Sequence, residues 1–192
     1  LGQRAPVDSI SWEDCQLFVQ KLCALEEVRD GTFRLLSGSE WEYACRAGTQ
    51  TAFCYGNSLA AIQENFNGKK PYGEALPGVV MGRTTVVGSY APNAFGLYDM
   101  HGNLREWCLE DGYSLPFGQA TVRTEGDPER WHMLHGGSWY NDGEQCRSAS
   151  SMSYPARVRY QNNGLRLCLD LRYTKQQAAS GDARPASGDG AG

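Results

Sequence analysis

The first third of the chain contains two segments with apolar residues at helical spacing. In residues 11–27 the apolar positions follow the i, i+3, i+4, i+7 pattern of one helical face: they are Cys15, Phe18, Val19, Leu22 and Leu25. This period predicts an amphipathic helix. Ser11, with Asp14 three residues later, gives that helix a start of the capping-box type.

A second, shorter helix is predicted over residues 39–47. Ser39 and Glu42 form its expected capping box, and the helical pattern stops at Gly48. The residues expected on its inner face are Trp41, Ala44 and Cys45.

Short apolar segments bounded by turn residues predict strands in the rest of the chain. They are residues 32–36, 104–109, 131–134, 146–149 and 165–169. Residues 49–82 and 111–130 are predicted to be loops. Residues 173–192 are rich in Ala, Gly, Ser, Asp and Pro and are predicted to be a disordered tail. The sequence therefore predicts one loop-rich α+β domain over residues 1–172.

Composition and charge narrow the range of partners. The chain has 192 residues, of which 41% are hydrophobic, enough for one domain with a core of its own. A net charge of -4 argues against nucleic acid, whose phosphates require a basic face. No run approaches the roughly 20 apolar residues of a membrane-spanning helix. We therefore expect an unidentified protein or small ligand as the partner, with no nucleic acid and no membrane span in this segment. The compartment stays open.

Seven cysteines are scattered along the chain, and none forms a Cys-x-x-Cys pair. This spacing does not favour a zinc ribbon or a thioredoxin-like site. We expect most of them to be buried thiols that pack as small apolar groups.

Residues 83–108 are dense in turn residues and in oxygen-bearing side chains, and they contain the run GLYDMHGNLREWC. This run resembles the signature of the formylglycine-generating enzyme (sulfatase-modifying factor) family. Further blocks of the chain are similar to that family in the same order: RLLSGSEWEYACRAGT at 34–49, HGGSW at 135–139, CRSA at 146–149 and GLRL at 164–167. Ordered blocks over such a length are far more specific than one short motif.

The resemblance implies an irregular variant of the C-type lectin fold, with two short helices packed on small antiparallel sheets. Family members carry a portion ahead of the block that begins here at Pro6, and this chain has no initiator Met. We therefore expect an N-terminally truncated domain.

The oxidases of this family hold copper with two cysteine thiolates, because soft sulfur ligands select Cu(I). Both thiolates lie between the Gly-Gly-Ser block and the later cysteine-containing strand. Here that interval, residues 139–145, contains no cysteine, and Asn141 falls where the first thiolate would be. We predict no copper site and lean against an enzyme. A related branch uses iron held by a separate histidine-rich domain; here we expect surface or second-shell roles for the histidines His101, His132 and His135.

Two structural features are implied by the resemblance alone. One is a calcium site formed by Asp99, the carbonyl groups of Gly102 and Leu104, and Glu106, since calcium accepts mixed oxygen ligands. The alternative is that Asp99 caps a turn and Glu106 pairs with an arginine, with no ion. The other feature is a disulfide bond between Cys45 and Cys146.

Residues 136–167 also resemble the variable region of retroelement-diversified proteins, which share this fold. In those proteins a fixed framework presents interspersed variable positions that often hold Tyr, Asn, Asp or Ser. The corresponding candidate ligand-binding residues are Tyr140, Asn141, Asp142, Glu144, Gln145, Ser150, Met152, Tyr154, Arg157, Arg159, Tyr160 and Gln161. Tyrosine with short polar groups is typical of adaptable binding surfaces.

The sequence thus favours a non-catalytic domain that binds a protein or small ligand through residues 140–161. Two alternatives stay open. One is an enzyme of the formylglycine-generating family with an altered active centre. The other is an accessory module of a signalling protein.

Overall fold

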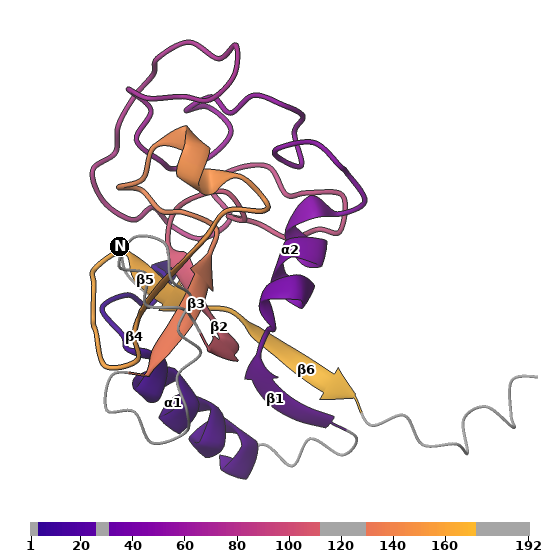
Figure 1. Ribbon diagram of the computed structural model, residues 1–192, viewed down its shortest axis with the longest axis vertical. Helices are drawn as coiled ribbons and strands as arrows, with labels where there is room; N and C mark the ends of the chain where they lie inside the picture. The colour runs from indigo at the N-terminus through magenta and orange to yellow at the C-terminus, as the bar shows by residue number, and fades with distance from the viewer. Residues whose placement is uncertain (1–3, 26–30, 112–129, 172–192) are drawn as a thin grey trace, which may run out of the picture.

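The computed structural model describes residues 4–25, 31–111 and 130–171. Within them the protein is an irregular α+β domain (Figure 1). Its longest helix, α1 (Trp12–Leu25), and a shorter helix, α2 (Gly38–Arg46), pack beside two small sheets. The predicted tail at 173–192 and most of the predicted loop at 111–130 lie outside the described residues.

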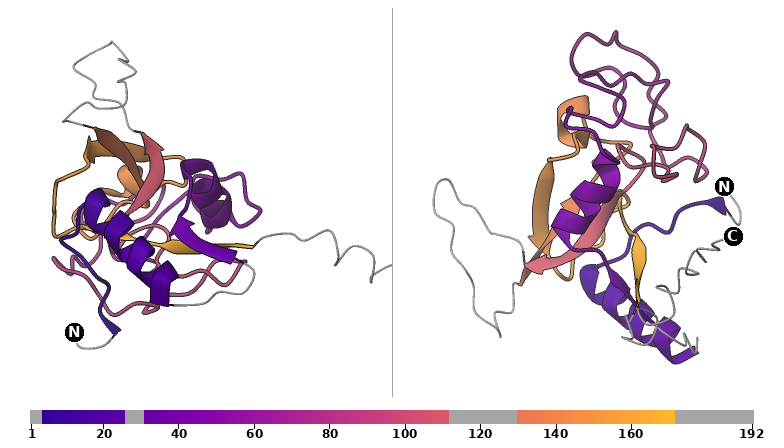
Figure 2. Two further views of the ribbon diagram at one scale, coloured as in Figure 1. Left: turned by 90° about the horizontal axis from the view of Figure 1, so that it is seen from below. Right: turned by 90° about the vertical axis from the view of Figure 1, so that its right-hand side faces the viewer.

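The capping box of α1 forms as predicted. The backbone N–H of Asp14 donates to Ser11 Oγ at 3.1 Å, and the backbone N–H of Ser11 donates to Asp14 Oδ2 at 2.9 Å. Cys15 and Val19 are buried, but Phe18 is 50% exposed, so its inward placement was wrong. The helix lies at one end of the domain and packs on β1, so only a narrow stripe is covered (Figure 2). Phe18 is rotated about 100° from Val19 and falls outside that stripe.

Leu25, also expected on the inner face, is 82% exposed at the last turn of α1. In α2 the capping box forms two residues earlier than predicted, with Ser37 as N-cap and Glu40 at its third position. Ser37 rather than Ser39 has the extended backbone that an N-cap requires, φ -69° and ψ 158°. The helix ends at Ala47, which has a left-handed φ of 46°.

A four-stranded sheet forms the centre of the domain, in the order β4-β3-β2-β5. Its strands are β2 (Arg105–Asp111), β3 (Trp131–His135), β4 (Ser151–Pro155) and β5 (Asn163–Leu165). The first three are antiparallel neighbours, whereas β5 runs parallel to β2. The expectation of purely antiparallel sheets therefore misses one pair.

The second sheet is an antiparallel pair of β1 (Gly31–Leu35) and β6 (Leu167–Leu171). The strand predicted over 165–169 is divided at Arg166 between β5 and β6. The strand predicted over 146–149 was wrong: a 3-10 helix, η2 (Gly143–Cys146), ends there and is followed by a turn. The short polar residues before Cys146 favour that local helix over a strand.

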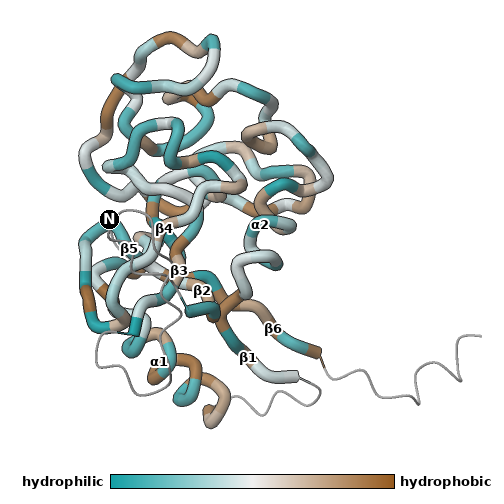
Figure 3. The backbone as a smooth tube through the Cα atoms, viewed as in Figure 1, coloured by the Kyte–Doolittle hydropathy of each residue, from teal (hydrophilic) through white to brown (hydrophobic). Residues whose placement is uncertain are grey.

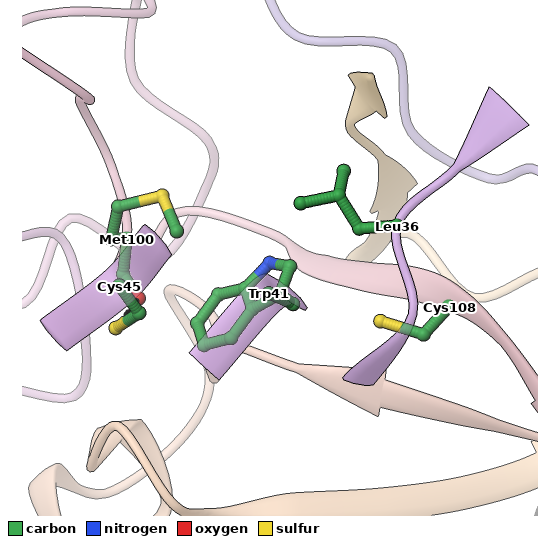
Figure 4. Packing of buried hydrophobic residues seen from close by; sticks show 5 residues of the cluster. All are labelled: Leu36, Trp41, Cys45, Met100 and Cys108. Atoms are coloured by element: carbon green, nitrogen blue, oxygen red, sulfur yellow. Dashed lines mark hydrogen bonds between the residues drawn. The ribbon is translucent and has the colours of Figure 1, made fainter. Parts of the chain in front are cut away.

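Buried side chains form clusters between these elements. Trp41 lies between Cys45 and Met100 on one side and Leu36 and Cys108 on the other (Figure 4). A second cluster joins α1 to the sheets through Cys15, Leu35, Trp107 and Leu134. A third lies under the loops: Phe53, Leu59, Phe66 and Cys146.

The chain between α2 and β2 forms a large loop region at one end of the domain, opposite α1 (Figure 1). Hydrophilic residues occupy much of this region (Figure 3). It is held by isolated bridges such as Leu59 with Tyr72 rather than by extended strands. In the described part of the chain, neither helix has the length and hydrophobicity that a bilayer crossing requires.

Candidate ligand-binding surface

The candidate surface begins where the chain leaves β3. Gly136 and Gly137 have left-handed φ values of 94° and 65°, which disfavour residues with a side chain. A Cβ atom at Gly137 would also collide with Cys146. This tight turn brings Trp139 and Tyr140 out beside the loop region, where the backbone N–H of Trp139 donates to the carbonyl of Asn103 at 3.1 Å. The aromatic pair is therefore presented by a well-anchored backbone.

Two clefts meet at this aromatic pair. The first, which we call the tyrosine pocket, has a volume of about 270 Å³ and is lined by Arg105, Trp139, Tyr140, Tyr154, Tyr160, Gln161 and Asn162. The second, which we call the lysine cleft, has a volume of about 510 Å³ and is lined by Asn67, Lys70, Val80, Gly82, Trp139, Tyr140, Asp142 and Gln145. Trp139 and Tyr140 contribute to both, so the two clefts form one continuous surface.

The structure brings about half of the predicted binding residues together on this surface. Those that line the tyrosine pocket or the lysine cleft are Tyr140, Asp142, Gln145, Tyr154, Tyr160 and Gln161. Tyr140 is 68% exposed and Tyr160 is 46% exposed. They supply aromatic area, and the amides and the carboxylate supply hydrogen-bonding groups.

The other predicted residues lie elsewhere. Asn141 is buried: its Oδ1 accepts from Ser138 Oγ at 2.7 Å and its Nδ2 donates to Gln145 Oε1 at 2.8 Å. It holds the turn together, so its placement on the binding surface was wrong. Ser150 and Met152 line a small cavity of about 50 Å³ beside Arg105.

Three exposed residues at the edges line neither cleft: Glu144, Arg157 and Arg159. Arg159 is turned toward α1, where its guanidinium makes two hydrogen bonds to the Asp14 carboxylate at 2.7 and 2.8 Å. That ion pair and the backbone N–H of Ser11 hold the pKa of Asp14 well below its usual range. Arg159 therefore has a partner within the chain already.

Arg105 lines the tyrosine pocket and was missed by the sequence analysis. It lies on β2 and is only 5% exposed. Its Nη1 donates to the Tyr154 hydroxyl at 3.4 Å, and its guanidinium lies 5.8 Å from the centroid of that ring. A signal was present: Arg105 and Glu106 are adjacent charges directly before the apolar residues Trp107, Cys108 and Leu109, and neighbouring strand residues point to opposite faces. The side chains of Arg105 and Glu106 therefore cannot form an ion pair with each other.

On the opposite face, Glu106 is fully engaged. Its Oε2 accepts from Trp41 Nε1 at 2.6 Å and from Arg166 Nε at 2.8 Å, and its Oε1 accepts from Arg166 Nη2 at 2.8 Å. A calcium ion at Glu106 would have to displace a guanidinium that already neutralises the carboxylate. This part of the implied ligand set does not fit a cation.

The rest of the implied calcium set lies only partly together. Asp99 Oδ2 accepts from the backbone N–H of Gly88 at 2.8 Å, and burial raises the pKa of the Asp99 carboxyl. Asp99, Leu104 and Glu106 line one cleft of about 590 Å³, whereas Gly102 packs closely on the backbone of Asn65. Among the described residues no three His, Cys, Asp or Glu side chains are grouped as a metal site. Calcium binding stays a prediction from the resemblance.

The implied disulfide bond is not present: Cys45 and Cys146 are both free, buried thiols. They belong to different clusters, and His101 lies between them, with Cys45 Sγ 3.6 Å from its Nε2 and the Cys146 carbonyl 2.8 Å from its Nδ1. His101 Nε2 accepts from the backbone N–H of Cys54, so Nδ1 carries the proton. Burial lowers the pKa of His101 to about 4, which keeps the ring neutral. All three histidines are buried, so of the two roles expected for them the surface one does not hold.

Residues 2–171 match the model of the sulfatase-modifying factor enzyme 1-like domain. The chain belongs to this family. It is 33% identical to the formylglycine-generating enzyme of Mus musculus over 163 residues, which are 82% of this chain and 40% of the mouse protein. This chain spans half or less of the length of the curated relatives it matches.

Solved structures agree with the predicted fold. PvdO from Pseudomonas aeruginosa is similar with a TM-score of 0.69 and 26% identity, covering 88% of this chain and 64% of PvdO. Variable protein 1 of Treponema denticola is similar with a TM-score of 0.70, covering 89% of this chain and 73% of that protein. At 19% identity the second likeness shows the fold alone. The predicted fold and the predicted family are both confirmed.

Proposed function

We propose that this domain binds a protein or small ligand without catalysis, through the surface formed by the tyrosine pocket and the lysine cleft. The observation that carries the proposal is the exposure of Tyr140 and Tyr160 around two adjoining clefts, on a backbone fixed by Gly136 and Gly137. Exposed tyrosines offer large contact area at low cost in conformational entropy. Neighbouring amides and charges supply hydrogen bonds to a partner.

The chemistry of the region where family oxidases hold copper supports a binding role over oxidation. Asn141, where the first thiolate would be, is a buried amide whose hydrogen bonds stay within its own turn. Burial raises the pKa of the Cys146 thiol to about 12, so it stays protonated at neutral pH. A copper site needs thiolates. Formation of formylglycine in a Cys-x-Pro-x-Arg peptide supplied with copper and oxygen would overturn the proposal.

We further propose that residues 136–167 form a diversified region of the retroelement type. The framework residues Gly136, Gly137 and Ser138 are buried, as is Asn141, whereas Tyr140 and Tyr160 are exposed. This division is what diversification on a stable scaffold requires. We expect the genome to carry a reverse transcriptase gene beside a near-copy of the DNA that encodes this segment. Sequencing the flanking DNA is the test, and flanks without either element contradict this part.

The binding role itself is tested with a double variant, Tyr140→Ala with Tyr160→Ala. Random peptides displayed on phage are selected against the wild-type domain, and the selected peptides are then measured against the variant. We expect affinity to fall at least tenfold, because truncation of a central interface aromatic commonly costs about 2 kcal/mol or more. Circular dichroism and thermal melting should match the wild type, since both side chains are exposed.

The matched control is Tyr43→Ala, which removes an exposed tyrosine on α2, far from the two clefts in sequence and absent from their linings. Its peptide affinities should equal those of the wild type. Equal losses in both variants would show nonspecific adhesion to tyrosine. Unchanged affinities in the double variant would place the binding site elsewhere on the domain.

A further inference from the structure

Arg105 is a buried guanidinium without an acidic partner. It is 5% exposed, and among residues 4–25, 31–111 and 130–171 no carboxylate lies within ion-pair distance of it. Its side-chain contacts are the hydroxyl and the ring of Tyr154. The partly buried Arg166 shows the usual arrangement, with two hydrogen bonds to Glu106. A buried charge without a counter-charge is unfavourable, so Arg105 calls for a compensating group that the described residues do not supply.

The contacts of Arg105 direct its charge into the tyrosine pocket. Its Nη1 donates to the Tyr154 hydroxyl, which leaves the proton of that hydroxyl free to donate to a further acceptor. Tyr154 is held in place by an edge-to-face contact with Tyr160, with ring centroids 5.1 Å apart. Asn162 and Gln161 bring amide groups to the same pocket. A cation and several hydrogen-bond donors therefore surround one small space with aromatic walls.

We propose that the tyrosine pocket recognises a carboxylate, supplied by an acidic side chain or the chain end of a peptide partner, through Arg105 and the Tyr154 hydroxyl. This inference rests on the proposed binding function and names its chemistry. Charge-assisted hydrogen bonds to a planar guanidinium suit a carboxylate. The pocket volume of about 270 Å³ lies below the roughly 300–1,000 Å³ of pockets for drug-sized ligands. It therefore fits a single side chain or terminus of a larger partner.

The local electrostatics support this assignment. Burial lowers the pKa of Arg105, but a guanidinium stays charged at neutral pH even so. Burial raises the pKa of the neighbouring Cys146 thiol to about 12, so that thiol is protonated at neutral pH and does not offset the charge of Arg105. A bound carboxylate would supply the missing negative charge.

The first test compares the two arginines. Arg105→Met removes a charge that lacks a partner, so we expect a Tm equal to or above that of the wild type. Arg166→Met removes a charge that pairs with Glu106 and should lower the Tm clearly. A fall in Arg105→Met as large as that in Arg166→Met would overturn the inference, because it would assign Arg105 a structural role.

The second test uses NMR titration of the 15N-labelled domain with blocked glutamate (N-acetyl-glutamate methylamide) and, as the matched probe, its glutamine counterpart. We expect saturable shifts at the Arg105 Nε–H with glutamate and none with glutamine. Binding should be lost in Arg105→Met and weakened several-fold in Tyr154→Phe, which keeps the ring. A response shared by both probes, or glutamate binding that persists in Arg105→Met, or no saturable shift with glutamate, would overturn the inference.

Acetate forms a further arm of this titration. Weaker binding of acetate than of blocked glutamate supports a peptide as the source of the carboxylate, whereas equal binding supports carboxylate recognition and assigns it to small acids.

The carboxylate inference and the proposed binding function can fail separately. If phage-selected peptides depend on Tyr140 and Tyr160 but glutamate does not bind, only the carboxylate inference fails. If no selected peptide depends on those tyrosines, the proposed function fails whatever glutamate does.

Discussion

Replacing Trp107 with Ala is expected to lower the free energy of unfolding by about 3–5 kcal/mol, the usual range for a buried aromatic. Trp107 is 1% exposed and packs with Cys15, Leu35 and Leu134, so one side chain joins α1, β1 and β3. Its Nε1 also donates to the carbonyl of Ile10 at 3.0 Å. Truncation would leave both a cavity and an unpaired, partly buried acceptor. Urea unfolding followed by tryptophan fluorescence and circular dichroism measures the change.

The matched control for this prediction is Tyr140→Ala. It removes another large aromatic, but from a side chain that is 68% exposed. Exposed substitutions of this kind usually change stability by no more than about 0.5 kcal/mol. A Trp107→Ala variant as stable as Tyr140→Ala would show that the cluster around α1 does not hold the domain together.

The elements that the sequence predicted well are those whose signals are local. The capping box at Ser11 and Asp14 depends on residues three positions apart, and it forms as expected. The pattern of α1 also predicted its buried residues Cys15 and Val19. What the pattern could not show is how wide a stripe the rest of the fold covers. That width is set by β1, which packs on α1 from a later part of the chain, and it leaves Phe18 exposed.

The loop-borne part of the surface was less predictable, for a physical reason. Asn141 and Tyr140 are neighbours with similar polarity, yet one is buried in a hydrogen-bonded turn and the other is exposed. No periodicity applies in an irregular turn, so inward and outward positions cannot be assigned by counting. The family resemblance points to the segment as a whole, but only the hydrogen bonds of Ser138 and Gln145 distinguish the buried Asn141 from the exposed Tyr140.

Two adjacent charged residues of β2, Arg105 and Glu106, have different surroundings. Because successive strand residues point to opposite faces, Glu106 reaches α2 and Arg166, whereas Arg105 reaches the tyrosine pocket. Both carboxylate oxygens of Glu106 accept hydrogen bonds from within the chain, whereas Arg105 has no acidic partner among the described residues. We infer that Glu106 stabilises the fold and that Arg105 is available to bind a partner.

Glu106→Ala is accordingly expected to destabilise the domain by about 3–5 kcal/mol, the range for breaking one side of a buried ion pair. It would leave the Arg166 guanidinium and the Trp41 Nε1–H without their acceptor, and Trp41 is 1% exposed.

The double variant Glu106→Ala with Arg166→Met should lose less stability than the sum of the losses in the two single variants, because no unpaired charge is left. Urea unfolding with and without a calcium chelator measures these changes. The pair seen here predicts the same loss in both conditions, whereas a loss that appears only with calcium present would assign Glu106 to the metal. A loss below about 1 kcal/mol would contradict a structural role for the pair.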